Sequence, residues 1–497
     1  MRILNPEPLT SHGNIAGRRA LLQILEAGMR AADPYYNTLD LLRVANGKLY
    51  VGRPQYEPRG APRSGEEIID LSTVGRIFVF GAGKGIQRVA KALEEKLGDH
   101  LTGGHVIGKH GDDVILEKIG VTLGGHPVPD EGCVQGCRRI LAMCQDLTGE
   151  DLVFTCAGNG VSALLTLPVD GVSLDDVRQI TYMMQIERGA PTQDLNPIRN
   201  HLDQMKGGRI SRHIQPATAI HIIARDPNYQ PFAMVQGYPQ LMRENLWLHT
   251  LPDFTTFADA VAMLKKWDAW DSAPPAARSF LERADPAAET VRAEEFERWR
   301  CRIFGVTPRE SGVIPAAKAK AVELGFRPYE LTEWLHAEAS EAGRVIANIA
   351  RSIEHRGEPF EPPCVLLTSG ELLVTVGQET GVGGRNQEYA LAGALAIAGS
   401  QNIVMAGVDT DGTDGPGGFS APDTGGIHCL SGGVVDGETL AEAKRAGVDI
   451  HDALKRHAAS DALWRLKSGI AATQNISLTD LGVTLIMGRA GDLSQPA

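Results

Sequence analysis

The feature that most constrains the fold of this chain is a repeated order of apolar run, glycine turn and helical segment. Arg76–Phe80 is a short β-rich run that meets Gly81, and Ile86–Leu97 then has the apolar spacing of a helix. Because no hairpin dipeptides separate the repeats, the pattern predicts an α/β fold with a doubly wound parallel sheet, whose ligands bind beyond the carboxyl ends of the strands. The order recurs at Leu152–Thr155 followed by Cys156–Ser162, and at Ala219–Ile223 ending near Asp226.

A second series of this kind follows a change in composition. The chain has 497 residues, more than the roughly 250–300 that one core usually holds, so we expect two domains. A tryptophan-containing, Ala/Glu/Arg-rich stretch from Asp253 to Val306 reads as a connection with surface helices, and we place the boundary at its start, giving domains 1–253 and 254–497. The later series comprises helix Ala316–Glu323, strand Pro328–Leu331, helix Glu338–Ile353, strands Cys364–Leu367 and Leu372–Val376, helix Asn386–Ala398 and strand Ile403–Ala406.

Charge and composition exclude several classes of protein. The net charge of −12 disfavours binding to nucleic acid, because such binding needs clustered Lys and Arg side chains. No apolar run reaches the length of a membrane span, and Met1–Asn14 lacks the apolar core of a signal peptide, so we expect a cytoplasmic location. Seven cysteines are too few for a disulfide framework, and Cys133, Cys137 and Cys144 are expected to be structural residues of one helix.

The loop Gly81–Gly85 (GAGKG) lies between a predicted strand and a predicted helix. It falls short of the dinucleotide fingerprint G-x-G-x-x-G, because Ile86 occupies the place of the third glycine, and no Walker A spacing can be drawn through Lys84. A lysine in this position is either solvated or placed to contact an anion, and its place at the end of a strand favours the anion. Gly81, Gly83 and Lys84 are therefore candidate site residues.

A second small-residue turn, Ala157–Ser162 (AGNGVS), follows another predicted strand. Backbone N–H groups in such a turn point at the start of the next helix, where a phosphate binds readily. Gly158, Asn159, Gly160 and Ser162 are the candidate phosphate contacts, although a tight packing turn would have the same composition.

The segment Leu195–Arg209 concentrates cations on one predicted helix and its C-terminal turn. Arg199, His201 and Lys206 lie within it, with a glycine pair before Arg209. The helical spacing is compatible with an ordinary salt-bridged surface or with a clamp for a substrate carboxylate or phosphate. We carry Arg199, His201 and Lys206 forward as substrate-binding candidates.

Two motifs in the second half combine glycine with charge. Gly383–Glu388 (GGRNQE) places Arg385 at a helix start, and Val408–Pro416 (VDTDGTDGP) places three carboxylates on a turn after a strand. Turn chemistry explains part of this composition. Three acids within six residues also suit Mg²⁺, which takes a few carboxylates together with substrate oxygens and water. The metal candidates are Asp409, Asp411 and Asp414.

Taken together, these motifs resemble those of the glycerate 2-kinase (MOFRL) family. The resemblance covers about residue 75 to the C-terminus. It implies an N-terminal Rossmann-like domain, a C-terminal MOFRL-type α/β domain and an active site in the cleft between them. The most specific pieces are Gly125–Glu131 (GHPVPDE), Asn196–Arg209, Gly383–Glu388 and Thr410–Pro416.

The resemblance also implies an activity: ATP- and Mg²⁺-dependent phosphorylation of glycerate, or of a related hydroxyacid or sugar acid, on the 2-hydroxyl. The family's catalytic lysine, aspartate and arginine correspond to Lys84, Asp226 and Arg385. The implied partners are a small hydroxyacid and a nucleotide, with neither nucleic acid nor membrane, and a homo-oligomer is left open. The alternatives are a non-kinase relative, of the kind labelled hydroxypyruvate reductase, and a non-catalytic ligand-binding protein.

Three loops depart from the family pattern. Cys156–Ser162 carries side chains where the family has a serine and three glycines, and Ala471–Asp480 replaces a threonine- and glycine-rich loop. The family's S-D-V-x-G-D becomes Arg225–Asn228, which loses a serine and adds the cation Arg225. Arg225 is therefore a further substrate-binding candidate: inside the cleft it would suit an acceptor that carries an additional carboxylate or phosphate. The alternative is a surface arginine paired with an acid.

Overall fold

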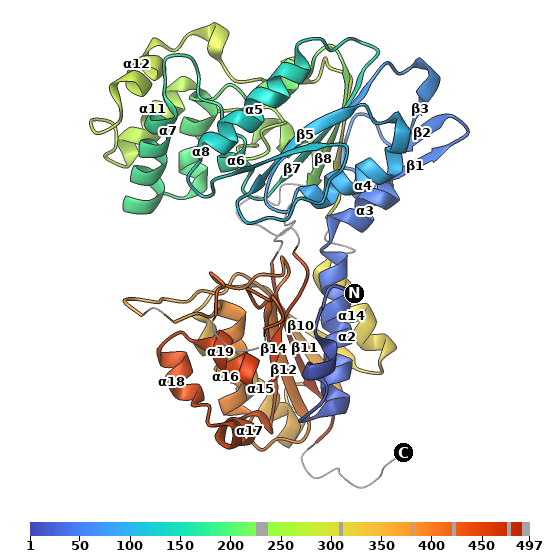
Figure 1. Ribbon diagram of the computed structural model, residues 1–497, viewed down its shortest axis with the longest axis vertical. Coiled ribbons are helices and arrows are strands. Elements are labelled where there is room, and N and C mark those ends of the chain that lie inside the picture. The colour runs from blue at the N-terminus through green and yellow to red at the C-terminus, as the bar shows by residue number, and fades with distance from the viewer. Residues whose placement is uncertain (225–236, 308–311, 380, 420–423, 475–478, 490–497) are drawn as a thin grey trace. The chain divides into compact units, whose positions relative to one another are not determined.

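The computed structural model describes residues 1–224, 237–307, 312–379, 381–419, 424–474 and 479–489, and the chain forms two compact units (Figure 1). The central unit contains Pro34–Pro308, and the terminal unit combines Met1–Asp33 with Arg309–Ala497. Each unit has its own six-stranded sheet, and the central unit also carries a small three-stranded sheet, β1-β2-β3.

The main sheet of the central unit is parallel throughout, in the order β6-β5-β4-β7-β8-β9. Its middle strands β4, β7 and β8 are almost entirely buried, as expected of a parallel sheet covered on both faces. Helices α5 and α9 pack on one face, against Phe78 and Phe80. The prediction of a doubly wound parallel sheet is confirmed. The strands are β1 (Leu42–Ala45), β2 (Lys48–Val51), β3 (Glu67–Asp70), β4 (Ile77–Ala82), β5 (Gly103–Lys109), β6 (Gly120–Gly124), β7 (Leu152–Gly158), β8 (Thr218–Ala224) and β9 (Cys301–Gly305).

The helices of the central unit follow the strands and add a separate subcluster. Helices α7, α8, α11 and α12 bury a core of their own that includes Ile198, Phe257 and Leu281. Cys133, Cys137 and Cys144 lie buried on α5 as free thiols, as expected. The helices are α3 (Pro34–Leu41), α4 (Gln87–Leu97), α5 (Glu131–Cys144), α6 (Val161–Leu164), α7 (Leu174–Thr181), α8 (Thr192–His201), α9 (Arg209–Ile214), α10 (Tyr238–Arg243), α11 (Phe257–Lys266), α12 (Pro275–Arg283) and α13 (Ala293–Phe296).

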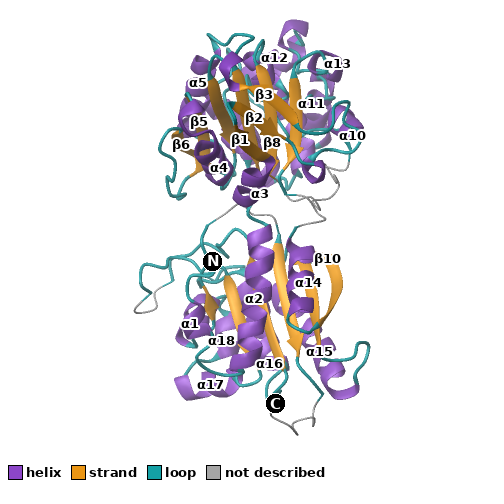
Figure 2. Cartoon of the chain, turned by 90° about the vertical axis from the view of Figure 1, so that its right-hand side faces the viewer, coloured by secondary structure: helices purple, strands orange, loops and turns teal. Residues whose placement is uncertain are grey.

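The terminal unit has a mixed sheet in the order β10-β11-β15-β12-β13-β14. Only β10 and β11 run parallel, and the other pairs are antiparallel. Helices α15, α16 and α19 cover one face, and α2 and α14 lie side by side on the other (Figure 2). The strands are β10 (Arg327–Leu335), β11 (Cys364–Gly370), β12 (Ile403–Asp409), β13 (Gly432–Asp436), β14 (Gly469–Ile470) and β15 (Asp480–Ile486), and the helices are α1 (Pro6–Leu9), α2 (Ile15–Ala31), α14 (Val313–Glu323), α15 (Ala339–Arg356), α16 (Arg385–Ala396), α17 (Thr439–Ala446), α18 (Ile450–Lys455) and α19 (Ala459–Arg465).

The compact units differ from the predicted domains 1–253 and 254–497 at both ends. The central unit continues to Pro308, because β9 pairs with β8 and completes the parallel sheet. The first 33 residues join the terminal unit, because α2 packs on β12 and β15. Neither pairing leaves a signal in the local sequence pattern.

The predicted strand Leu372–Val376 is wrong. This segment makes only an isolated parallel bridge between Leu373 and Glu338. The Leu372 N–H donates to a carboxylate oxygen of Asp480 at 2.8 Å and thereby leaves the strand ladder. Side-chain capping of the backbone takes the place of the predicted strand.

Candidate active site

The two glycine turns of the central unit lie against each other at the carboxyl ends of β4 and β7. Gly83 has φ +152°, and a Cβ there would lie 2.8 Å from the Gly158 Cα, so only glycine fits without displacement. The Lys84 N–H donates to the Asn159 carbonyl at 2.7 Å. The structure therefore brings together five of the candidate phosphate contacts, Gly81, Gly83, Gly158, Asn159 and Gly160. Their contact with a phosphate stays a prediction.

Ser162 has a different environment. Its hydroxyl is buried within α6 and hydrogen-bonded to Nε2 of His249, 2.8 Å away. The side chain is thus used inside the unit. When His249 Nε2 is the donor of this bond, the hydroxyl can still donate to a phosphate, so the predicted contact stays a prediction.

The Lys84 side chain runs beside His126, which comes from the Gly125–Glu131 motif. A Cβ placed on Gly160 would meet the His126 ring at 3.0 Å and the Lys84 Cγ at 3.1 Å. Gly160 has φ +80°, so both the backbone and the space require glycine. The sequence prediction does not include His126 among the site residues, although His126 belongs to the specific motif Gly125–Glu131.

Arg199 is a buried cation on α8. Its guanidinium donates to Gln185 Oε1 at 3.1 Å, and among the described residues no carboxylate lies within ion-pair distance. Burial lowers the pKa of Arg199 to about 10. An isolated buried cation is costly unless an anion joins it, so Arg199 fits the predicted substrate contact.

His201 and Lys206 are used inside the unit instead. The His201 ring bonds to the Pro197 carbonyl at 2.7 Å and to Glu289 at 2.8 Å. Lys206 Nζ donates to Asp203 and Thr166, each at 2.7 Å. Both side chains are almost completely buried. The predicted clamp is therefore divided, because Arg199 alone of these three residues has no carboxylate partner among the described residues.

Two predicted residues lie outside the described part of the chain: Asp226, the expected base, and Arg225, the added cation. The strand that leads to them, β8, ends at Ala224 beside Gly158 of β7. Their roles stay predictions from the sequence.

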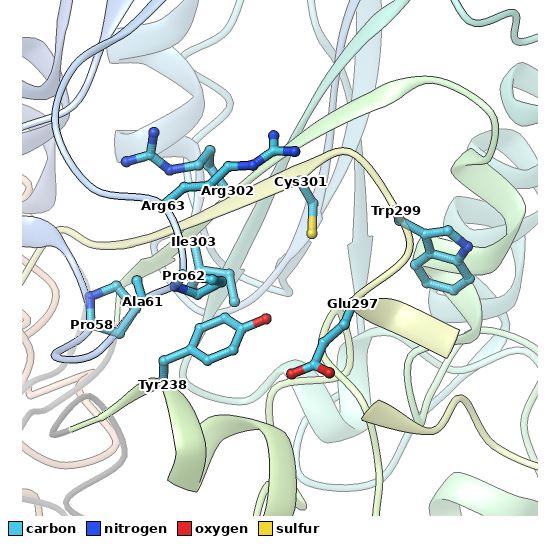
Figure 3. A pocket seen from close by; sticks show the side chains of 10 residues that line it. All are labelled: Pro58, Ala61, Pro62, Arg63, Tyr238, Glu297, Trp299, Cys301, Arg302 and Ile303. Atoms are coloured by element: carbon cyan, nitrogen blue, oxygen red, sulfur yellow. The ribbon is translucent and has the colours of Figure 1, made fainter. Parts of the chain in front are cut away.

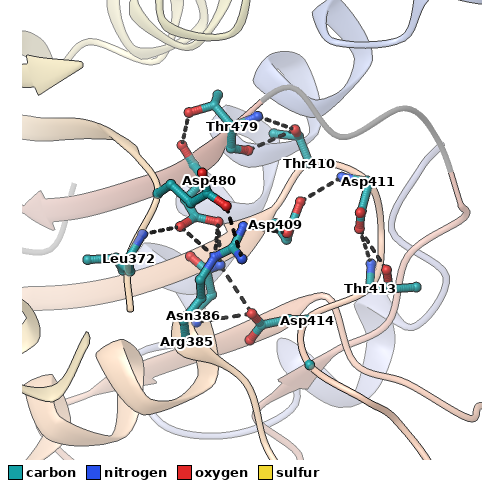
Figure 4. Close-up of polar contacts among 12 residues, drawn as sticks. Leu372, Arg385, Asn386, Asp409, Thr410, Asp411, Thr413, Asp414, Thr479 and Asp480 are labelled. Carbon is teal, nitrogen blue, oxygen red and sulfur yellow. Dashed lines mark hydrogen bonds and ion pairs between the residues drawn. The ribbon is translucent and has the colours of Figure 1, made fainter. Parts of the chain in front are cut away.

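In the terminal unit, Arg385 is the centre of a group of carboxylates (Figure 4). Its Nε donates to both oxygens of Asp480, at 2.9 and 2.8 Å, and Nη2 donates to Asp409 at 2.8 Å. Burial acts to lower the pKa of Arg385, but the surrounding carboxylates, Asp480 first, outweigh it and raise the pKa above its ordinary value. Arg385 is thus always charged and firmly oriented.

Asp480 is a site residue that the sequence interpretation missed. It begins β15 and accepts hydrogen bonds from Asn386 Nδ2 and from the Leu372 N–H, each at 2.8 Å. Burial raises its pKa, and the Arg385 charge acts against that rise. The only sequence signal was its position at the end of the divergent loop Ala471–Asp480.

Asp414, one of the predicted metal ligands, forms hydrogen bonds at the start of α16. Its carboxylate accepts the N–H of Asn386 at 3.2 Å and of Gln387 at 3.0 Å, at the start of α16. Burial, and then the Asp480 charge, raise its pKa to about 7. Asp414 thus occupies the anion position at this helix N-terminus and fixes Arg385 at the helix start.

Asp409 and Asp411 are better placed for a cation. Asp409 Oδ1 accepts the Asp411 N–H at 3.0 Å, and Asp411 Oδ1 accepts the Thr413 N–H at 2.7 Å. The other Asp411 oxygen has no protein partner among the described residues. Burial first, and the Asp411 charge second, raise the pKa of Asp409 well above its ordinary range, so a cation here would relieve repulsion.

The carboxylates of Asp409 and Asp411 fit a Mg²⁺ ion that completes its coordination with substrate oxygens and water. Within the described ranges, no group of three or more His, Cys, Asp or Glu side chains is arranged to hold a metal ion. Mg²⁺ commonly takes only one or two protein carboxylates and completes its shell with substrate phosphates and water. Asp411, with Asp409 behind it, satisfies this minimum, whereas Asp414 is committed to α16.

A separate cavity of about 150 Å³ lies by the amino end of β9. Figure 3 shows Arg63 and Arg302 on the side opposite Tyr238 and Glu297. Arg302 is paired with Glu57 and Glu67. Because ligands of parallel sheets bind at the carboxyl ends of the strands, this cavity is not assigned to the reaction.

Comparison with known proteins identifies the family. Residues 20–282 match the family described as "Domain of unknown function (DUF4147)", and residues 364–479 match the MOFRL family. A glycerate 2-kinase of Pyrococcus horikoshii is 31% identical over 90% of this chain and 91% of its own length. A relative from Agrobacterium vitis, provisionally named hydroxypyruvate reductase, is 30% identical over 89% of this chain and 88% of its own.

A solved structure agrees. The crystal structure of a glycerate kinase from Thermotoga maritima superimposes with a TM-score of 0.71 and 26% identity, covering 94% of this chain and 99% of that one. The fold and the charged loops define a two-unit α/β protein of the phosphotransferase type. The chain belongs to the glycerate 2-kinase (MOFRL) family, as a divergent member. No helix among the described residues is both long and apolar enough to span a membrane.

Proposed function

We propose that this protein transfers the γ-phosphoryl group of ATP to the 2-hydroxyl of glycerate or of a related hydroxyacid or sugar acid. The observation that carries the proposal is Lys84 at the carboxyl end of β4, beside a glycine turn and near the buried Arg199, with no carboxylate paired to either cation among the described residues. Such an arrangement binds anions. The names of the relatives supply the acceptor.

The reaction forms a bond between the acceptor oxygen and the γ-phosphorus and breaks the bond from that phosphorus to the β–γ bridging oxygen. In the proposal, Lys84 neutralises charge on the transferring phosphoryl group, and Asp226 accepts the hydroxyl proton, a role that rests on the sequence resemblance. Arg199 holds an acidic group of a ligand. Catalysis of this kind is mainly positioning and electrostatic stabilisation.

The terminal unit contributes Arg385 and the acidic turn. The carboxylates of Asp480 and Asp409 fix the direction of the guanidinium, and Asp414 fixes the helix start from which Arg385 projects. We assign Arg385 to neutralisation of phosphoryl charge. Asp411, with Asp409, would hold Mg²⁺, which would reduce the negative charge on the phosphate groups when bound.

The test is ATP turnover with Mg²⁺ against a panel of hydroxyacids and sugar acids. We expect ADP release that depends on one or a few acceptors, with glycerate among the first to examine, and a phosphorylated product detected by mass spectrometry. NADH oxidation with hydroxypyruvate, in the absence of any acceptor-dependent ADP release, would instead assign the chain to the reductase alternative.

A further inference from the structure

His126 lies in the central unit with its ring unused by the protein. The ring and the Lys84 side chain both border the space above Gly160, at 3.0 and 3.1 Å from the position of a Cβ there. Neither nitrogen of His126 forms a hydrogen bond with a described residue. A half-buried imidazole without a partner is available to a ligand.

The charges that face His126 are all positive. Lys84 comes from the β4–α4 loop, Lys109 from the end of β5 and Arg199 from α8, and none of the three forms an ion pair with a described residue. On the histidine's own segment, Asp130 is paired with His110 at 2.6 Å. Burial first, and then these three cations, lower the pKa of His126 to about 4. The free site therefore holds a neutral imidazole in a cationic environment.

We propose that His126, Lys84 and Arg199 form a binding site for a phosphate-bearing ligand, and that His126 takes up one proton from the solvent when the ligand binds. The inference rests on the proposed function for the source of the phosphate. The unpaired cations Lys84, Lys109 and Arg199 favour a ligand with more than one negative charge. A phosphate dianion has that charge and a monocarboxylate does not. The bound anion reverses the local potential and stabilises the imidazolium, which donates hydrogen bonds from its ring N–H groups.

The ligand phosphate has two sources with the same chemistry, the nucleotide and a phosphorylated hydroxyacid. Calorimetric titration of the full-length protein in EDTA separates them, with pyrophosphate as the nucleotide probe, 2-phosphoglycerate as the hydroxyacid probe and glycerate as the monoanion. We expect at least one phosphate probe to bind tenfold or more tightly than glycerate. The tighter of the two identifies the source. Glycerate binding as tightly as both would overturn the assignment to phosphate.

Proton uptake is measured by repeating the titration at pH 6.5 in buffers of different ionisation enthalpy. His126→Gln should bind at least tenfold more weakly and take up fewer protons per ligand than the wild type, because glutamine keeps a donor but cannot be protonated. His110→Gln is the matched control, since its ring is already paired with Asp130. It should behave like the wild type. Equal proton numbers for the wild type and His126→Gln would refute the linkage.

If His126→Gln keeps its circular dichroism spectrum but binds too weakly to titrate, the site assignment is supported and the proton is followed in the wild type. Its affinity for the fully ionised ligand, obtained by correcting for the ligand's own protonation, should then rise from pH 7.5 to pH 5.5, because protonation of His126 favours the anion. An affinity that falls over this range contradicts the proton uptake. Since these titrations involve no turnover, their failure is distinct from failure of the proposed kinase activity.

Discussion

Arg18 and Asp436, which lie near opposite ends of the chain, form a buried ion pair in the terminal unit, with Arg18 Nε 2.6 Å from Asp436 Oδ2. The side chains are 0% and 1% exposed. Arg18 comes from α2 and Asp436 from the end of β13, so the pair fastens the N-terminal segment to the mixed sheet. Removal of one partner from a buried pair leaves an uncompensated charge, which typically costs about 3–5 kcal/mol.

Asp436→Asn should therefore lower the free energy of unfolding by about 3 kcal/mol at pH 7. Burial acts to raise the pKa of Asp436, but Arg18 and the backbone donors outweigh it, so the pKa is lower than in the unfolded chain. The stability from this pair is present above roughly pH 4 and is lost as the pH falls through the folded pKa. Urea unfolding at pH 7 and at pH 3.5 should show a variant effect that shrinks with acid. An equal effect at both values would contradict this.

Lys84→Ala should reduce turnover by about 10² or more while the melting temperature changes by only a few degrees, because the lysine fills no core and supplies one preorganised electrostatic contact. Lys96→Ala, in the last turn of the following helix α4, is the control and should keep its activity. Unfolding of Lys84→Ala would mean that the residue is structural.

Gly83→Ala tests the contact between the two glycine turns. The added Cβ would lie 2.8 Å from the Gly158 Cα, and we expect activity to fall at least tenfold with a stability loss of roughly 1–3 kcal/mol. Gly98→Ala is the matched control, since Gly98 also has positive φ, +54°, but has nothing within 4 Å of its Cβ position. Equal losses in the two variants would attribute the effect to backbone strain alone.

Asp411→Asn and Asp414→Asn should separate metal binding from helix capping. Asp411→Asn is expected to weaken Mg²⁺ binding in the presence of nucleotide about tenfold without changing the unfolding free energy, because its free oxygen faces no protein donor. Asp414→Asn should cost about 0.5–2 kcal/mol of stability through the α16 N-terminus. Calorimetry and urea unfolding measure the two quantities, and an unchanged Mg²⁺ affinity in Asp411→Asn would remove this residue from the metal site.

Arg225→Ser restores the family's residue. It should change the selectivity between a larger anionic acceptor and glycerate, expressed as the free-energy difference from their kcat/KM values, by at least ~1 kcal/mol. The reason is that the planar guanidinium of arginine favours an acceptor with an additional anionic group. Steady-state kinetics with the acceptor panel measures the ratio. A constant ratio across the panel would exclude Arg225 from acceptor selection.

The sequence by itself determined the local features of this protein. Apolar periodicity located β4, β7 and β8, and glycine with charge at the strand ends located Lys84, Gly158 and Arg385, because strand, turn and helix starts depend on residues close together in the chain. The strand Leu372–Val376 shows the limit of that reasoning, since a side chain more than a hundred residues away captures its backbone.

Only the tertiary structure decided which charges are paired and which stay available. His201 and Lys206 lie in the same segment as Arg199, yet Glu289 and Asp203 pair with them, while Arg199 has no carboxylate partner among the described residues. Asp414 caps the start of α16, and Asp480 forms an ion pair with Arg385. Arg18 forms an ion pair with Asp436, which is more than four hundred residues away in the sequence. The physical reason is that burial and Coulomb interactions depend on distance in space, which local patterns do not specify.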